Sequence, residues 1–116
     1  MEVQDLSSVR EPNDEDDMIR QIRSTLLGCV GDRIKRVLLY GSRASGNARG
    51  DSDYDILVVE EVPVSKRDEA GRLRRALEHL PMAVDVWVMG EEEFEETKDV
   101  IGGLAFPARK YGKDLI

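Results

Sequence analysis

The sequence has very little cysteine and histidine, with one residue of each. Cys29 has no second thiol with which to form an internal disulfide or share a zinc site, and we interpret it as a small buried hydrophobic residue. His79 falls near the end of an expected helix, where histidine commonly complements the helix dipole. The scarcity of cysteine excludes a disulfide-stapled scaffold.

The chain also lacks a long apolar run. No stretch approaches the ~18 consecutive apolar residues of a membrane span, and the acidic residues 1–17 contain no signal-peptide core. We therefore expect a cytoplasmic protein. Acidic residues outnumber basic ones by 24 to 17, giving a net charge of −7. This balance disfavours generic nucleic-acid binding and favours a basic partner surface or a substrate that arrives with metal ions.

The length of 116 residues fits one domain with its own core and leaves no room for a second lobe. Residues 1–13 contain almost no apolar side chains and predict a flexible acidic segment. We therefore place the folded domain at residues 14–116. No internal repeat and no low-complexity tract interrupts it.

Short apolar runs predict three strands, at residues 34–40, 54–59 and 82–89. The second strand contains four consecutive apolar residues from Ile56, which indicates burial on both faces of a sheet. The third strand alternates two sets of side chains, and one set carries a charge at Asp85.

Apolar residues that recur at three- and four-residue steps predict helices around these strands. The first helix begins near Asn13 and ends at Gly31. Its apolar stripe consists of Ile19, Ile22, Leu26 and Val30. The acidic segment 91–99 predicts a later helix, before a short last element. One side of the later helix carries Phe94, Lys98 and Ile101.

A capping box marks the helix between the second and third strands, with Ser65 followed three residues later by Asp68. Its core stripe consists of Ala70, Leu73, Leu77 and Leu80. Pro81 ends this helix. The order of helix, strand, turn, strand, helix, strand and helix predicts an α/β (α+β) domain around a small mixed sheet flanked by helices.

Carboxylates recur where the second strand begins, at Asp51, Asp53 and Asp55. Side chains two residues apart on a strand lie ~6.6 Å apart and share a face. At ~5 Å and an effective dielectric near 20, each such pair costs about 3 kcal/mol in repulsion. Cations offset this cost, and Mg²⁺ prefers hard oxygen ligands and substrate phosphates. Asp53 and Asp55, with Asp85 from the third strand, therefore predict a magnesium site, whereas Asp51 is better interpreted as solvated.

Gly41 and Ser42 follow the first strand directly. A glycine lets the backbone approach a phosphate closely, and Ser42 offers a hydroxyl and backbone amides where a short helix begins. An EF-hand loop is excluded, because its sixth and twelfth positions require glycine and glutamate and are Ile56 and Val62 here. The turn is therefore predicted to hold a triphosphate beside the metals.

The chain contains Gly41-Ser42, then ten intervening residues, then Asp53-Tyr54-Asp55, and later Asp85 in a Val-Asp-Val strand. This pattern resembles the nucleotidyltransferase superfamily related to DNA polymerase beta. The size and the stretch GSRASGNARGDSDYDILVV are similar to the minimal nucleotidyltransferases, often antitoxins paired with HEPN-type ribonuclease toxins. The resemblance implies the polymerase beta-like fold. It covers the chain from the first helix to about Met89.

The resemblance also implies roles for individual residues. Gly41 and Ser42 would hold the β- and γ-phosphates of a nucleoside triphosphate. Two Mg²⁺ ions would be ligated by Asp53 and Asp55, with Asp85 helping to bind metal and activating the acceptor hydroxyl. The sequence departs from the family pattern at Ser45, where arginine is common. Arg43 or Arg49 is the candidate for supplying that charge to the triphosphate.

The implied activity is Mg²⁺-dependent transfer of AMP from ATP to a hydroxyl, with a tyrosine of a partner HEPN-type toxin as the acceptor. One alternative is a binding antitoxin without catalysis, which the Ser45 departure favours and the three acids oppose. A second is a small-molecule, aminoglycoside-type enzyme that completes its site by forming a homo-oligomer.

Two further features leave alternatives open. Trp87 shares a strand face with Asp85 and is suited to stacking on a base or to a core or interface position. The helix after Ser65 is strongly basic, and we interpret its charges as a solvated face in preference to a docking surface. Those residues are Lys66, Arg67, Arg72, Arg74 and Arg75.

Overall fold

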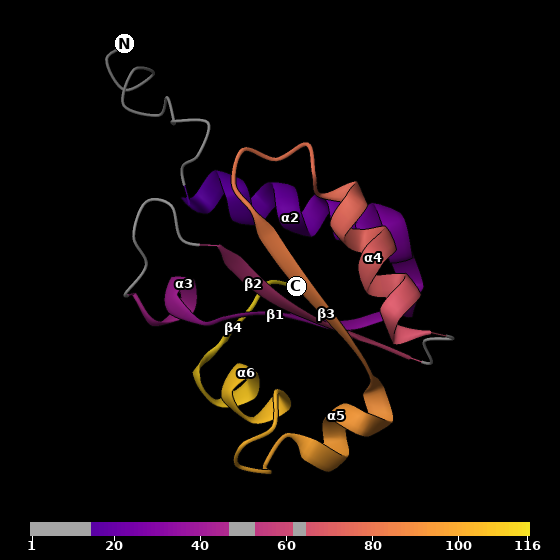
Figure 1. Ribbon diagram of the computed structural model, residues 1–116, viewed down its shortest axis with the longest axis vertical. Helices are drawn as coiled ribbons and strands as arrows, with labels where there is room; N and C mark the ends of the chain where they lie inside the picture. The colour runs from indigo at the N-terminus through magenta and orange to yellow at the C-terminus, as the bar shows by residue number, and fades with distance from the viewer. Residues whose placement is uncertain (1–14, 47–52, 62–64) are drawn as a thin grey trace.

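The computed structural model describes residues 15–46, 53–61 and 65–116. At its centre is a mixed sheet with the strand order β3-β2-β1-β4 (Figure 1). The strands are β1 Ile34–Tyr40, β2 Tyr54–Glu60, β3 Val84–Gly90 and β4 Lys113–Asp114. β1 is antiparallel to β2 and β4, whereas β2 and β3 are parallel. The predicted fold class, a small mixed sheet flanked by helices, is confirmed.

Helices cover both faces of this sheet (Figure 1). They are α2 Glu15–Val30, α3 Ser42–Ser45, α4 Lys66–Ala76, α5 Glu91–Thr97 and α6 Ala105–Tyr111, with a 3-10 turn η1 at Gly31–Arg33. α2 and α4 pack on one face, and α5 and α6 pack on the other. Two predictions lie outside the described residues: the acidic segment 1–13 and the start of the first helix near Asn13.

The central strand β2 confirms the predicted burial on both faces. Ile56 and Val58 contact the core beneath α2 and α4, while Leu57 and Val59 contact the core beneath α5 and α6. All four side chains are fully buried, because a strand with a neighbour on each side and helices above and below has no exposed face.

The predicted capping box begins α4, where the Ser65 hydroxyl accepts a hydrogen bond from the Asp68 backbone amide. α4 ends at Ala76, earlier than its apolar pattern indicates, although Leu77 and Leu80 are still buried in the turns that follow. β3 begins at Val84 rather than Met82. Buried apolar residues therefore extend beyond the residues whose backbone hydrogen bonds define each element.

One expectation for the C-terminal part is wrong, and one strand was missed. Ile101 is 84% exposed and lies beyond the end of α5 at Thr97, so it does not extend the apolar side of that helix. β4 has no counterpart in the sequence-based prediction. It pairs with β1 over two residues only, which is too short for alternation to be detected. No helix in the described ranges is long and apolar enough to cross a membrane.

A buried carboxyl pair links the end of β2 to α4. Glu60 is 1% exposed and lies 3.9 Å from the Arg33 guanidinium, while Glu69 lies 3.0 Å from that of Arg72. Burial, then the hydrogen bond with Glu69, raises the pKa of Glu60 from 4.5 to about 7. That bond lowers the pKa of Glu69. Of the two carboxyls, Glu60 therefore keeps its proton to the higher pH in the folded protein.

We expect Glu60→Gln to remove a pH-dependent loss of stability. Because the folded pKa of about 7 lies above the ordinary 4.5, the free energy of unfolding falls as pH rises through that window. Glutamine keeps the donor to Glu69 but does not titrate. The variant should match wild type near pH 4.5 and be more stable at pH 8 by on the order of 1–3 kcal/mol.

Urea unfolding of the two proteins at pH 4.5, 6 and 8 measures this difference. The matched control is Glu61→Gln, which neutralises the adjacent, exposed glutamate and should leave the pH dependence of wild type unchanged. Parallel stability–pH curves for wild type and Glu60→Gln would contradict the assignment.

Candidate active site

The turn after β1 brings Gly41 against a carboxylate. Gly41 has φ 75° and ψ −155°, a region that is essentially restricted to glycine. A Cβ atom at this position would lie 2.5 Å from Oδ2 of Asp55. α3 begins at the next residue, Ser42, as the sequence predicted. Only glycine therefore lets the chain turn here while Asp55 keeps its position.

The register of the sheet aligns three polar side chains in one row. Asp55 on β2 lies opposite Tyr40 on β1 and beside Asp85 on β3. Adjacent strands are ~4.8 Å apart, and side chains at paired positions share a face. This is the face that α5 and α6 cover farther along the strands, so the row lies at its uncovered end.

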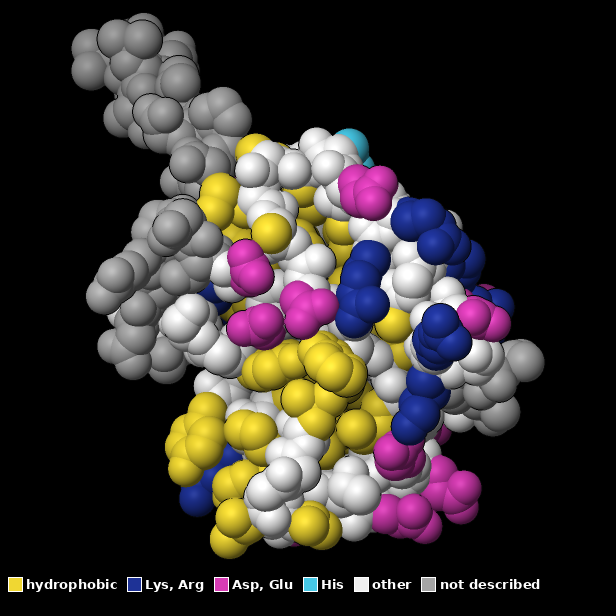
Figure 2. Space-filling model, in the orientation of Figure 1, with side chains coloured by type: hydrophobic (Ala, Val, Ile, Leu, Met, Phe, Trp, Pro, Cys, Tyr) yellow, Lys and Arg dark blue, Asp and Glu magenta, His cyan; other side chains and the backbone are white. Residues whose placement is uncertain are grey.

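Acidic side chains gather on this open face, beside basic side chains and above a hydrophobic patch (Figure 2). Asp55 and Asp85 are partly exposed, and Asp53, immediately before β2, is exposed. Burial, followed by the charges of Asp85 and Asp53, raises the pKa of Asp55. Burial and the charges of Asp55 and Asp85 also raise the pKa of Tyr40. The charges of Asp53 and Asp85 thus both act on Asp55.

Arg74 of α4 is the cation next to these acids. Its Nη2 lies 3.2 Å from Oδ1 of Asp85 and donates a hydrogen bond of 2.7 Å to the Val86 carbonyl oxygen. Among the residues that the structure describes, no group of three histidine, cysteine or acidic side chains is close enough to hold a metal ion. Carboxylate oxygens are the ligands that Mg²⁺ prefers, but here Asp85 has the Arg74 guanidinium as its ionic partner, and the predicted metal-binding group is not assembled.

Arg43 of α3 packs against the residue between Asp53 and Asp55. Its guanidinium carbon lies 4.5 Å from the ring centroid of Tyr54. Tyr54 belongs to the core on the α2 and α4 face, opposite the face of Asp55, so this contact does not bring Arg43 into the row of acids. Arg49 and Asp51 fall outside the described residues.

Sequence reasoning missed Tyr40 and the link between Arg74 and Asp85. The position of Tyr40 before Gly41 was visible in the sequence, but its place beside Asp55 depends on the strand register. Arg74 was one of several basic residues on α4, and nothing in the spacing distinguished it. Trp87 is 48% exposed, which excludes the core position considered for it.

Residues 17–107 match the nucleotidyltransferase domain family. Because this match spans most of the chain, the protein belongs to that family and is a nucleotidyltransferase. No curated protein matches the chain. The resemblance that rested on Gly41, Ser42 and the three aspartates is thereby confirmed at the level of the family.

Solved structures share the fold. A crystal structure of a toxin–antitoxin with AMP-PNP is 20% identical with a TM-score of 0.54, covering 88% of this chain and 73% of that chain. The toxin–antitoxin MntA–HepT is 17% identical with a TM-score of 0.59, covering 88% and 72%. A putative nucleotidyltransferase from Sulfolobus solfataricus is 23% identical with a TM-score of 0.56, covering 79% and 86%.

Proposed function

We propose that the protein transfers AMP from ATP to a hydroxyl group, a tyrosine, of a partner HEPN-type toxin and thereby acts as its antitoxin. The observation that carries the proposal is the contact between the Gly41 turn and Asp55, beside Asp85 on the next strand. This contact supports a single site made of the predicted phosphate-binding turn and the predicted metal ligands.

Each residue of this site has a distinct role in the proposal. Gly41 and Ser42 hold the β- and γ-phosphates, and Arg43 adds positive charge. Asp53, Asp55 and Asp85 hold Mg²⁺, which when bound neutralises the triphosphate and orients its oxygens.

Asp85 lies at the edge of the row and accepts the proton of the acceptor hydroxyl. The hydroxyl oxygen then forms a bond to the α-phosphorus. The bond between that phosphorus and the bridging oxygen breaks, and pyrophosphate leaves.

The fold neighbours support the proposed donor and acceptor. Two of the fold neighbours are toxin–antitoxin structures, and one of these contains AMP-PNP. These observations support a nucleoside triphosphate as the donor and a toxin as the partner.

A binding antitoxin without catalysis is the second candidate. The ion pair between Arg74 and Asp85 favours it, because that arginine competes with a metal for the carboxylate. The departure at Ser45 from the arginine of the family pattern favours it as well.

Intact-mass spectrometry distinguishes the two candidates. After co-expression with the product of the neighbouring gene, we expect the partner to gain one or more units of about 329 Da, the mass that adenylyl transfer adds to a hydroxyl. Asp85→Asn should prevent the gain without preventing association, because Asp85 activates the acceptor and does not dock it.

The matched control is Asp99→Asn, which also removes an arginine-paired aspartate, 2.6 Å from Arg109, but outside the site. It should label the partner as wild type does. A partner that is neutralised while its mass never changes would establish the binding antitoxin and exclude the transferase.

A further inference from the structure

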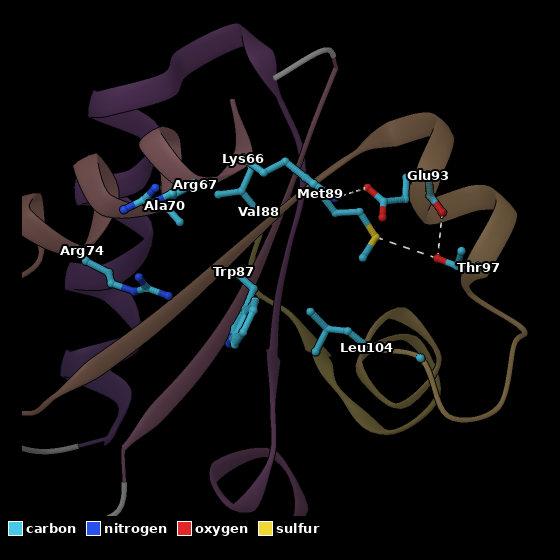
Figure 3. A pocket seen from close by; sticks show the side chains of 11 residues that line it. Lys66, Arg67, Ala70, Arg74, Trp87, Val88, Met89, Glu93, Thr97 and Leu104 are labelled. Atoms are coloured by element: carbon cyan, nitrogen blue, oxygen red, sulfur yellow. Dashed lines mark hydrogen bonds and ion pairs between the residues drawn. The ribbon is translucent and has the colours of Figure 1, made fainter. Parts of the chain in front are cut away.

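A groove runs beside β3, between α4 and α5, with a cavity of about 740 Å³ (Figure 3). We call it the β3 groove. Its apolar lining includes Val88, Met89 and Leu104. Trp87 also lines the groove, is 48% exposed, and is the single tryptophan of the chain. A large aromatic side chain is thus exposed over an apolar hollow, which is typical of a binding surface.

The β3 groove is continuous with the candidate active site. Asp85 and Trp87 are two residues apart on β3, so their side chains share a face and lie ~6.6 Å apart along the strand. Arg74 belongs to both regions, because it lines the groove and forms the ion pair with Asp85. A ligand that lies in the groove therefore reaches the acid that is proposed to activate the acceptor.

The groove is basic although the protein is acidic. Its cations are Lys66, Arg67 and Arg74, and its one acidic residue is Glu93. Glu93 is 2.8 Å from the Lys66 ammonium and neutralises it. Arg67 is exposed and forms no ion pair within the described part of the chain. Arg74 is paired with Asp85, so the surplus positive charge of the groove comes from Arg67, in contrast with the net charge of −7.

We propose that the β3 groove binds the acceptor segment of the partner protein, an acidic stretch with apolar side chains. Its apolar side chains lie against Trp87 and Leu104, a carboxylate pairs with Arg67, and an adjacent hydroxyl-bearing residue reaches Asp85. The inference rests on the proposed function, because only a protein acceptor requires a peptide groove beside the catalytic acid. It assigns α4 a docking role in place of the solvated face that the sequence indicated.

The single tryptophan allows a direct test, because Trp87 fluorescence reports on the groove alone. The probe is a synthetic peptide with one tyrosine flanked by glutamate and leucine. We expect a saturable change in emission, and no change with the peptide that carries lysine in place of glutamate. Arg67→Glu should weaken binding roughly tenfold through charge reversal. Glutamate in the first turn of α4 suits the helix dipole, so the variant should fold.

Arg75→Glu is the matched control, since Arg75 is exposed on the same helix and does not line the groove. It makes the same change in net charge and should alter peptide affinity by no more than about twofold. Equal weakening by the two variants, or no fluorescence response in wild type, would overturn the proposal. So would loss of the peptide response when ATP and Mg²⁺ saturate the protein, because a nucleobase would then occupy the groove in place of the peptide.

Partner labelling separates this inference from the proposed function. If the partner gains no mass with Arg67→Glu while calorimetry shows unchanged ATP affinity, both the transferase function and the peptide groove are supported. Labelling that persists at the wild-type rate in Arg67→Glu rejects the groove and leaves the transferase intact. Peptide binding without any labelling by wild type rejects the transferase and leaves the groove as a peptide site.

Discussion

Asp55→Asn is expected to reduce nucleotidyl transfer by at least about 10²–10³-fold while the melting temperature in EDTA stays at or above that of wild type. The loss of activity follows because a preorganised charge at the reacting centre is removed. Stability is kept because the raised pKa of Asp55 means that its ionisation disfavours the folded state as pH rises through that pKa. At pH 7 asparagine relieves both the burial of the charge and its repulsion by Asp85 and Asp53.

Thermal melts with and without Mg²⁺ and ATP test the two parts together. Ligands that bind the folded state raise the melting temperature of wild type, and the variant should lose most of that increase. Asp114→Asn serves as the control, because Asp114 is exposed on β4, 3.1 Å from Arg36, and lies outside the site. An Asp55→Asn protein that unfolds would show that Asp55 is structural, and one that retains transfer would exclude Asp55 from the catalytic group.

Gly41→Ala is expected to abolish transfer and to lower the free energy of unfolding by about 1–3 kcal/mol. An alanine must adopt φ 75° and ψ −155°, and its Cβ would lie 2.5 Å from Oδ2 of Asp55. The carboxylate must then rotate away from the turn, so the site loses its geometry even where the fold survives. ATP affinity by calorimetry and transfer by mass spectrometry should fall together.

The Gly31→Ala variant distinguishes the effect of backbone strain at a positive φ from the effect of displacing the Asp55 carboxylate. Gly31 also has a positive φ, of 63°, but a Cβ there meets nothing within 4 Å, and it lies at the end of α2. This control should cost about 1–2 kcal/mol of stability and leave transfer unchanged. Equal losses of activity in the two variants would mean that general destabilisation, and not the contact with Asp55, explains the effect of Gly41→Ala.

The acidic composition of the chain does not describe its binding surface. The net charge of −7 predicted a basic partner surface or a substrate that arrives with metal ions, and that prediction stays open, whereas the groove proposed as a docking site carries surplus positive charge from Arg67. Composition averages over the whole chain, whereas recognition depends on the few charges that one face collects.

Local signals in the sequence were sufficient for most of the elements. The apolar run at 34–40 became β1 with the same bounds, and the Ser65 capping box became the start of α4. These signals are local because each depends on neighbours within a few residues. The same locality explains why β4 was missed, since two residues have no period and are held only by their pairing with β1.

The sequence by itself determined the family and the chemical character of the site, because Gly41, Ser42 and the three aspartates are recognisable from their types and spacing alone. Only the tertiary structure decided which of them meet. The register of β2 brings Tyr40, Asp55 and Asp85 into one row, and the packing of α4 beside β3 sets Arg74 against Asp85 next to the groove at Trp87. Strand pairing and helix packing involve residues far apart in the sequence and depend on the whole core. The spacing of residues along the chain therefore does not predict them.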